Sequence, residues 1–248
     1  MNIELHRHGA IQEIRLARPP VNALTPELLV ALRTAVQAAP SEGARGIILT
    51  GGNKVFSGGM DVPHLMALDR AGLKAGWSSL FAAARTLANS PIPVVAAIGG
   101  HSPAGGCVLA LCCDYRIMAR GPYRIGLNEV QVGLVAPDAI QHLLRRVVGT
   151  YRAERLLVAG ALVESEQALA IGLVDELTDD VFTRAQNWLE ELLALPPAAM
   201  QATRGIARAD MVEALTGFAD SELDGFLDDW YAPATQAALQ ALVARLKK

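Results

Sequence analysis

The sequence lacks any long apolar run and any recognisable leader segment. No stretch approaches the roughly 18–20 uninterrupted apolar residues that span a bilayer. The first residues show neither a basic stretch followed by an apolar one nor an Arg- and Ser-rich amphipathic pattern. We therefore expect no membrane partner, and a protein that is cytoplasmic or already processed.

The sequence also has no excess of positive charge. Its 22 Lys and Arg residues are outnumbered by 25 Asp and Glu residues, which gives a formal net charge of −3. Binding to a phosphate backbone needs a basic face. This balance argues against nucleic acid as a partner.

Cysteine and histidine are both scarce. The three cysteines, Cys107, Cys112 and Cys113, lie in one apolar segment, with no histidine at metal-ligand spacing. A redox or metal site is one interpretation, but buried small hydrophobic residues are the better one. An odd number with an adjacent pair also fits a reducing compartment. We expect no metal.

The abundant apolar residues are arranged in two patterns. They make up 52% of 248 residues, which is enough for one large domain with a full core. In the first half, helical segments alternate with expected strands at residues 11–17, 46–50, 93–98, 114–119 and 124–127. From residue 137 onward the pattern is nearly all helical, and the main strand-like exception is at residues 173–175.

These patterns predict an α/β domain followed by a helical region. We place a soft boundary near residue 195, with a core over residues 1–195 and a C-terminal helical region over residues 196–248. The rear helices are short and rich in Ala and Leu. Such helices need a partner surface, which is either the core or another subunit.

Two glycine-rich turns are candidates for a functional site. The first covers residues 57–60 and follows a strand, and its glycines permit positive φ or close approach to a ligand. The second covers residues 103–106 and opens an apolar helix, so its free N–H groups lie at a positive dipole end. Each turn also has a structural interpretation: a surface turn for the first, and close strand–helix packing for the second. Together they suggest an oxyanion hole, which needs two converging donors.

Glu129 is a single acid in an apolar loop that includes Leu127, Val130 and Leu134. Burial there would raise its pKa towards neutrality and make it a usable base, whereas a solvent-facing loop acid is the alternative. The neighbouring Asn128 could orient a substrate or the carboxylate, or simply close a turn.

Residues 100–104 resemble the start of a serine-hydrolase elbow. The fifth position is alanine, however, and Pro103 follows Ser102. Proline has no N–H group, so half of the oxyanion hole of that architecture would be missing. The hydrolase interpretation therefore loses most of its support.

At these residues the chain resembles the crotonase superfamily of enoyl-CoA hydratases and isomerases. The shared segments lie in order along nearly the whole chain: residues 18–24 (RPPVNAL), both glycine turns, residues 113–117 (CDYRI) and residues 172–175 (GLVD). The resemblance implies an α/β fold, a crotonase-like ββα spiral with a C-terminal α-helical trimerisation region, and assembly as a homotrimer or a dimer of trimers. It also implies an acyl-CoA thioester substrate whose carbonyl oxygen lies between the N–H groups of Met60 and Gly105.

The subfamily depends on the carboxylates. Hydratases carry one glutamate in the helix after the second glycine turn and another in the later loop, but here the helix position is Val108 and only Glu129 is acidic. Valine cannot activate water, whereas one base can still move a proton between two carbons. Residues 125–129 (IGLNE), with residues 103–107 (PAGGC) upstream, resemble the mitochondrial-type Δ3,Δ2-enoyl-CoA isomerase in particular, which implies that Glu129 is catalytic.

In that subfamily the substrate-binding residues would be Ser57, Gly58, Gly59, Met60, Asp61, Gly105 and Asn128. Coenzyme A would be part of the substrate, and no separate cofactor is expected. Lys247 and Lys248 could reach a CoA phosphate, although a frayed basic tail is the preferred interpretation.

Three alternatives remain open at this level. Asp138 stands where dienoyl-CoA isomerases have an aspartate at or next to the position, so a relay of two carboxylates is one of them. The preferred interpretation of Asp138 is a helix-start acid after Pro137. Slow hydration is the second alternative, and the third is a non-catalytic acyl-CoA-binding subunit.

Overall fold

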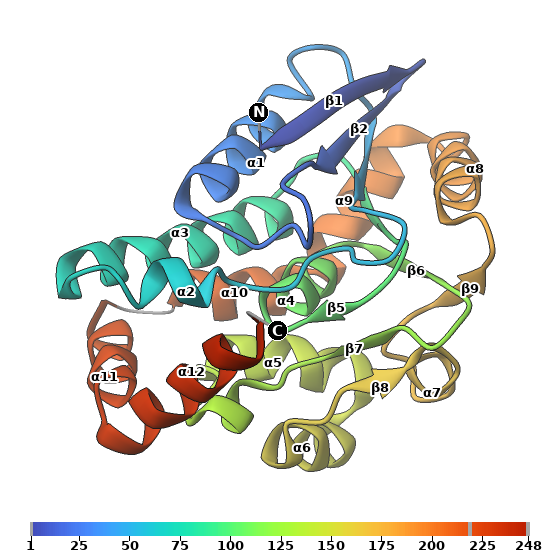
Figure 1. Ribbon diagram of the computed structural model, residues 1–248. Coiled ribbons are helices and arrows are strands. Elements are labelled where there is room, and N and C mark those ends of the chain that lie inside the picture. The colour runs from blue at the N-terminus through green and yellow to red at the C-terminus, as the bar shows by residue number, and fades with distance from the viewer. Residues whose placement is uncertain (1, 218–219, 247–248) are drawn as a thin grey trace.

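The computed structural model describes residues 2–217 and 220–246, and a six-stranded sheet forms its centre (Figure 1). In spatial order the strands are β1 (Ile3–His8), β2 (Ile11–Leu16), β3 (Gly46–Thr50), β4 (Val94–Ile98), β6 (Tyr115–Ala119) and β9 (Glu176–Thr178). The β1–β2 pair is antiparallel and every other neighbouring pair is parallel.

Helices cover both faces of this sheet, which explains the unbroken apolar character of β3 and β4. Alternate strand residues such as Ile47 and Val94 point into the main core against α1 (Pro26–Ala38), α3 (Arg70–Ala88) and α4 (Gly105–Leu111). The intervening residues, such as Ile48, pack beneath α8 (Val181–Leu193) on the other face. A strand that is buried on both sides needs apolar side chains in both directions.

A smaller sheet carries the elements of the candidate site. Its strands are β5 (Ser102–Pro103), β7 (Arg124–Gly126) and β8 (Val163–Glu164), with β5 parallel and β8 antiparallel to β7. Helix α4 begins directly after β5, and the short 3-10 helix η1 (Glu129–Val132) follows β7. The small sheet therefore brings the second glycine turn and the Glu129 loop to neighbouring strands.

The expected strand at residues 173–175 is wrong, because β9 begins one residue later. The N–H groups of Leu173 and Val174 both donate to the carbonyl of Ala168, at the end of α7 (Ser165–Ala170). Asp175 accepts a hydrogen bond from the N–H of Arg116 and pairs with its guanidinium at 2.7 Å. The segment is thus a helix-ending turn and an ion-pair anchor.

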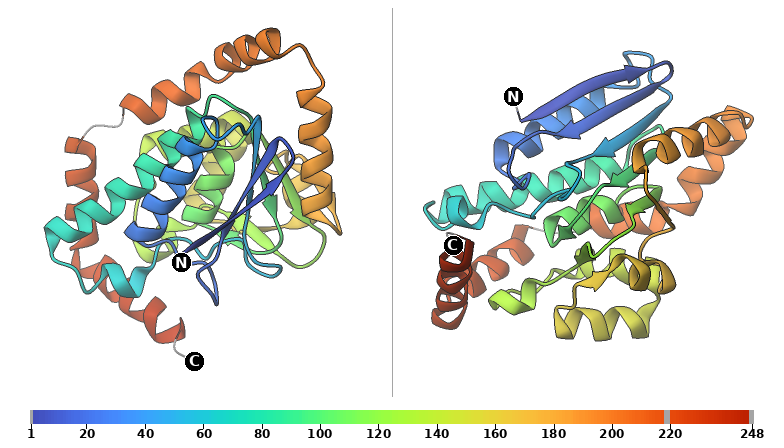
Figure 2. Two further views of the ribbon diagram at one scale, coloured as in Figure 1. Left: turned by 90° about the horizontal axis from the view of Figure 1, so that it is seen from above. Right: turned by 45° about the vertical axis from the view of Figure 1, so that its right-hand side comes forward.

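The remaining helices are α2 (Val62–Leu65), α5 (Asp138–Val148), α6 (Thr150–Ala159), α9 (Pro197–Ala207), α10 (Ala209–Gly217), α11 (Asp220–Trp230) and α12 (Pro233–Leu246). The C-terminal helices run around the outside of the α/β core (Figure 2). Helix α11 packs on α3 through Trp77, whose ring meets Phe226 and Trp230 edge to face. Helix α12 packs against η1 and α2.

Helix α9 starts close to the expected boundary at residue 195 and buries none of its own residues. The helices α10, α11 and α12 pack on the core instead. A separate C-terminal region and its role in trimers stay predictions. Within residues 2–217 and 220–246, no helix combines the length and apolarity needed to cross a membrane.

Candidate active site

The first glycine turn orients the N–H of Met60 away from Leu24 and the neighbouring chain. The N–H of Leu24 donates to the carbonyl of Gly59 at 2.8 Å, and the N–H of Asp61 donates to the carbonyl of Leu24 at 3.0 Å. In a trans peptide the N–H points opposite to the C=O. Because the Gly59 carbonyl faces Leu24, the Met60 N–H faces the opposite side, where it has no acceptor among the described residues.

The second glycine turn orients the N–H of Gly105 by the same geometry. The N–H of Val108 donates to the carbonyl of Ala104 at 3.0 Å, as in the first turn of a helix. The Gly105 N–H in the same peptide unit therefore points out of the start of α4, and the described chain offers it no acceptor. This arrangement requires Ala104 to adopt φ 47° and ψ −120°, a strained conformation of the kind that clusters at functional sites.

The two turns touch, so the two N–H groups lie side by side. A Cβ at Gly105 would lie 3.5 Å from the Met60 nitrogen and 2.9 Å from Cδ1 of Leu24. A Cβ at Gly59, where φ is +84°, would lie 3.3 Å from the Gly105 nitrogen. At Gly59 the backbone conformation favours glycine, and at Gly105 a side chain would press on the end of Leu24. Two adjacent free donors of this kind can bind an oxyanion.

Glu129 is the first residue of η1, three positions after β7. Its carboxyl oxygen Oε2 is buried and has no hydrogen-bond partner, and the same is true of Oδ1 of Asn128. Burial raises the pKa of Glu129 from its ordinary value of 4.5 to about 7, and a backbone hydrogen bond within the residue opposes the shift. Buried polar atoms normally have a partner, so these two oxygens are candidates for contacts with a bound molecule.

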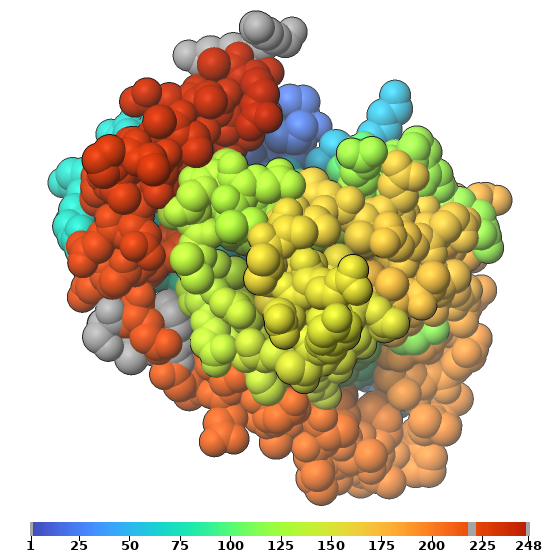
Figure 3. Space-filling model, turned by 90° about the horizontal axis from the view of Figure 1, so that it is seen from below, coloured from blue at the N-terminus to red at the C-terminus, as the bar shows by residue number. Residues whose placement is uncertain are grey.

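Contacts from distant segments hold η1 in place. The hydroxyl of Thr235 in α12 donates to the carbonyl of Gly133 at 3.0 Å, and the amide of Gln131 donates to the carbonyl of Gly160 at 2.7 Å. The space-filling view from below shows the C-terminal helices in red beside the yellow-green segment that contains η1 (Figure 3). Glu129 is therefore placed by β7 on one side and by α6 and α12 on the other.

An apolar pocket adjoins Glu129. Apart from Glu129 and Gln141, its walls are apolar: Leu127, Val130, Leu134, Val135, Ala136, Leu157 and Val158. Val135 and Val158 are exposed and lie at its outer end, whereas Leu127 and Leu134 are buried. The pocket thus runs from the carboxyl group towards the surface between η1, α5 and α6.

The other predicted site residues have structural partners. Ser57 is buried, and its hydroxyl donates to the carbonyl of Asn22 at 2.8 Å. Asp61 caps α2 and pairs with Arg18 at 2.6 Å. Val108 is buried in α4 and brings no polar group to the site. Direct substrate contacts of Ser57, Gly58 and Asp61 stay predictions.

Asp138 lies outside the pocket of Glu129. It is the first residue of α5, its side chain is 79% exposed, and Arg145 pairs with it at 2.7 Å. This arrangement agrees with the preferred interpretation as a helix-start acid. Lys247 and Lys248 fall outside the described residues.

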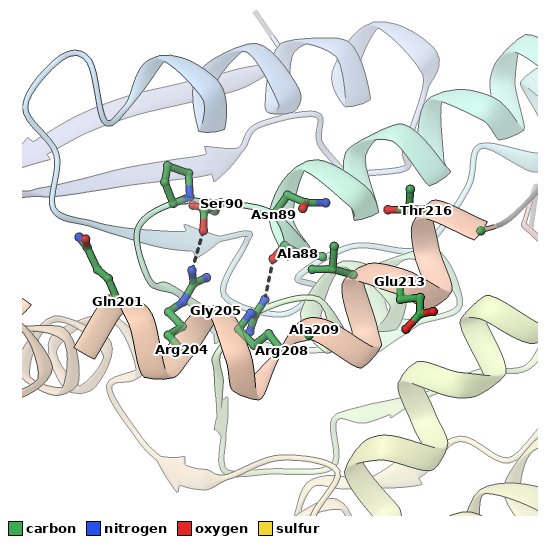
Figure 4. A pocket seen from close by; sticks show the side chains of 13 residues that line it. Ala88, Asn89, Ser90, Gln201, Arg204, Gly205, Arg208, Ala209, Glu213 and Thr216 are labelled. Atoms are coloured by element: carbon green, nitrogen blue, oxygen red, sulfur yellow. Dashed lines mark hydrogen bonds between the residues drawn. The ribbon is translucent and has the colours of Figure 1, made fainter. Parts of the chain in front are cut away.

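A separate cavity lies between the end of α3 and the helices α9 and α10 (Figure 4). Its two arginines are hydrogen-bonded to the main chain: Arg204 donates to the carbonyl of Ser90, and Arg208 donates to those of Ala88 and Cys112. Both also pair with Asp114, at 2.7 and 3.0 Å. Both arginines thus hold α9 and the start of α10 against the core.

The described residues contain no cluster of metal-ligating side chains. No group of three or more His, Cys, Asp or Glu side chains within residues 2–217 and 220–246 could hold a metal ion. The three cysteines are free and buried, as expected of small hydrophobic residues.

The mostly parallel six-stranded sheet, the small second sheet and the helical C-terminal half form the fold of the crotonase superfamily. The chain belongs to the enoyl-CoA hydratase/isomerase family, whose sequence profile matches residues 6–246. It is 32% identical to human mitochondrial enoyl-CoA delta isomerase 1, over 99% of this chain and 83% of that protein. It is 34% identical to a probable enoyl-CoA hydratase of Mycobacterium tuberculosis, over 76% of this chain and 73% of that protein.

Solved structures give the same assignment. The structure of human mitochondrial Δ3,Δ2-enoyl-CoA isomerase matches with a TM-score of 0.95 and 31% identity, over 100% of this chain and 98% of that one. An enoyl-CoA hydratase from Bacillus halodurans matches with a TM-score of 0.88 and 25% identity, over 97% and 100% of the two chains. The predictions of the family, of its fold and of an isomerase are thereby confirmed.

Proposed function

We propose that the protein is a Δ3,Δ2-enoyl-CoA isomerase of fatty-acid β-oxidation, which converts a 3-enoyl-CoA into the conjugated 2-enoyl-CoA. The observation that carries this proposal is the buried oxygen Oε2 of Glu129, which has no partner among the described residues, with the apolar Val108 at the position where hydratases have a second acid. One carboxyl group suffices for an isomerisation, because no water is added.

The proposed reaction moves one proton within the substrate. The thioester carbonyl oxygen accepts hydrogen bonds from the N–H groups of Met60 and Gly105. The ionised carboxylate of Glu129 takes a proton from C2, the C3–C4 double bond shifts to C2–C3 through a dienolate, and Glu129 returns the proton at C4. The two N–H donors stabilise the dienolate oxygen; each donor of this type contributes about 2.7–4 kcal/mol in other enzymes.

The pKa of Glu129 suits both half-reactions. A value of about 7 leaves a large fraction ionised at neutral pH while making the carboxylate a stronger base than an ordinary glutamate. The protonated form is then available to deliver the proton to C4. An acid with an ordinary pKa would be ionised but a weaker base.

The surroundings of Glu129 fit an acyl thioester. The apolar pocket beside the carboxyl group can take the hydrocarbon chain, and the free Oδ1 of Asn128 lies next to the base. The glycine turn at residues 57–61 would lie along the thioester. Coenzyme A is then part of the substrate, no further cofactor is needed, and a homotrimer or a dimer of trimers is the expected assembly.

The location of the protein is a separate proposal. A cytoplasmic site of action stays our prediction from the sequence, and the similar proteins of human and mouse are named mitochondrial.

The alternatives have less support from the site. Dienoyl isomerisation by two carboxylates needs Asp138 in the pocket, yet its side chain is exposed and paired with Arg145. Hydration needs a group that activates water at the α4 position, where the side chain is that of Val108. A non-catalytic binder gives no reason for a buried carboxyl group without a partner, which costs stability.

The deciding experiment follows conjugation by ultraviolet absorbance with a trans-3-enoyl-CoA, with hydration of a 2-enoyl-CoA measured in parallel. We expect rapid conjugation and little hydration. Glu129→Gln is expected to abolish conjugation while still binding a saturated acyl-CoA. Hydration faster than conjugation, or full activity of Glu129→Gln, would refute the proposal.

A further inference from the structure

Residues 18–24 run alongside the first glycine turn and are hydrogen-bonded to it at several points. The N–H of Gly58 donates to the carbonyl of Val21 at 2.8 Å, and the N–H of Leu24 donates to that of Gly59 at 2.8 Å. The second of these bonds sets the direction of the Met60 N–H, as described above. The orientation of that N–H therefore depends on where residues 18–24 hold Leu24.

Asn22 holds this segment in its bent path. It is a buried non-glycine residue with positive φ, at 50°, where asparagine is among the better tolerated residues. Its Oδ1 accepts the N–H of Arg18 at 2.9 Å, and its Nδ2 donates to the carbonyl of Phe56 at 3.1 Å. One carboxamide thus closes the turn at residues 18–22 and ties it to the residue before the glycine turn.

The main chain of Asn22 adds a second connection to the same turn. Its carbonyl accepts the hydroxyl of Ser57 at 2.8 Å, and the oxygen of that hydroxyl accepts the N–H of Gly59 at 3.2 Å. The N–H of Gly59 is held through Ser57, and the carbonyl of Gly59 is held through Leu24. Both sides of Gly59 are therefore fixed by groups that Asn22 places.

We infer that Asn22 is a positioning residue for the Met60 N–H donor: its side chain fixes residues 18–24, which in turn fix the Gly59–Met60 peptide. Asn22 itself lies behind the donor and makes no contact with substrate in this account. The inference rests on the proposed function insofar as Met60 donates to a substrate oxyanion. Loss of the carboxamide removes two of the hydrogen bonds that hold residues 18–24, so the Gly59–Met60 peptide is held less firmly. This weakens binding of a charged oxygen more than binding of a neutral thioester.

Two substitutions of Asn22 and one control separate the roles of this residue. Asn22→Gly removes the carboxamide but accepts positive φ without strain, so it isolates the hydrogen bonds from the backbone conformation. Asn22→Asp keeps an acceptor for the N–H of Arg18 and loses the donor to Phe56. Asn89→Ala is the matched control, because Asn89 also donates its Nδ2 to a backbone carbonyl, that of Arg85 at 2.9 Å, at an exposed helix end.

The readout is the fraction of bound acetoacetyl-CoA present as its enolate, which absorbs in the near ultraviolet and places negative charge on the thioester oxygen. For Asn22→Gly we expect this fraction and kcat for a 3-enoyl-CoA each to fall about tenfold, part of the 10²–10³-fold effect of deleting a whole donor. The Kd of a saturated acyl-CoA is expected to change less than about threefold. Asn22→Asp should be intermediate, and Asn89→Ala unchanged.

Each outcome bears on one of the two claims. Unchanged enolate fraction and kcat in folded Asn22→Gly would overturn the inference and leave the isomerase proposal standing. A wild-type protein without isomerase activity, whose enolate signal nevertheless falls in Asn22→Gly, would refute the isomerase and support the inference. If Asn22→Gly does not fold, Asn22→Asp decides by the same criteria, since aspartate also tolerates positive φ.

Discussion

Two glutamates, Glu13 and Glu129, have buried carboxyl oxygens but differ in what surrounds them. The side chain of Glu13 in β2 is 3% exposed and receives hydrogen bonds from His8 at 2.9 Å, Arg15 at 3.0 Å and Thr50 at 3.3 Å. Burial acts to raise its pKa, but the bonds from His8 and Arg15 outweigh this and hold the pKa below its ordinary value. Glu13 is therefore a fixed anion that ties β2 to β1 and β3.

Glu129 has burial without such partners. Its buried Oε2 has no donor, and its pKa rises to about 7. The hydrogen-bond partners of a buried carboxylate, and not its burial alone, therefore decide whether it is an anchor or a base. A paired carboxylate is held in one protonation state, while an unpaired one can exchange a proton near neutral pH.

The largest expected effect is on catalytic activity, where the two glutamates should differ most. Glu129→Gln should lower kcat for a 3-enoyl-CoA by at least about 10³-fold, because the reaction loses its only base. Glu13→Gln should keep kcat within about twofold for the folded fraction, since Glu13 holds β2 between β1 and β3 and is not part of the candidate site. Steady-state assays of both variants, with folded fractions from circular dichroism, test this pair. Equal losses in the two would contradict it.

The second prediction concerns stability: replacing Glu129 should stabilise the protein at high pH, whereas replacing Glu13 should destabilise it. The folded pKa of Glu129, about 7, lies above the ordinary 4.5, so its contribution to stability is full below about pH 4.5 and is lost as pH rises through about 7. Relative to wild type, Glu129→Gln should gain roughly 3 kcal/mol in unfolding free energy between pH 4.5 and pH 8. Urea unfolding at the two values measures this, and a difference independent of pH would contradict it.

Glu13→Gln should instead destabilise the protein at neutral pH. Its lowered pKa means that the stabilisation is present above the ordinary pKa and is lost as pH falls through the folded value. Loss of charged hydrogen bonds to Arg15 and His8 should cost about 2 kcal/mol. Urea unfolding at pH 7 is expected to show this loss, and unfolding below pH 4 a smaller one; a deficit that grows towards low pH would disprove the anchor role.

The smallest effect concerns the support of η1 by the C-terminal helix. Thr235→Val keeps the shape of the side chain but removes its hydrogen bond to the carbonyl of Gly133, which should cost about 1 kcal/mol. A two- to fivefold fall in kcat is expected as η1 loosens, on the order of the same energy. Thr34→Val is the matched control, because Thr34 also donates to a backbone carbonyl, on the exposed face of α1. Equal behaviour of the two variants would show that α12 does not position Glu129.

Much of the site could be predicted from the sequence because it depends on local signals. The glycine turns are marked by glycine itself, and the raised pKa of Glu129 follows from its apolar neighbours. Most strand positions were predictable from apolar runs, whereas residues 173–175 form an apolar turn because Asp175 pairs with Arg116 across the fold. Such long-range partners leave no local pattern.

The supports of the site were not predictable from the sequence. Ala104 has positive φ although alanine gives no sign of it, and asparagine at Asn22 is only a weak marker of such a conformation. The contact of Thr235 with Gly133 joins residues 102 positions apart. The sequence thus predicts which groups react, and the three-dimensional structure is needed to show what holds them. Trimer formation and the substrate contacts of residues 57–61 stay predictions.

The most direct test of the central claim is the pH dependence of kcat/KM for a trans-3-enoyl-CoA. The account predicts a rise of about tenfold per pH unit at low pH, one inflection at about pH 7 from ionisation of Glu129, and a plateau above it. A profile that is flat from pH 5 to 9, or whose inflection lies at the ordinary glutamate value of 4.5, would contradict a buried, unpaired Glu129 as the base.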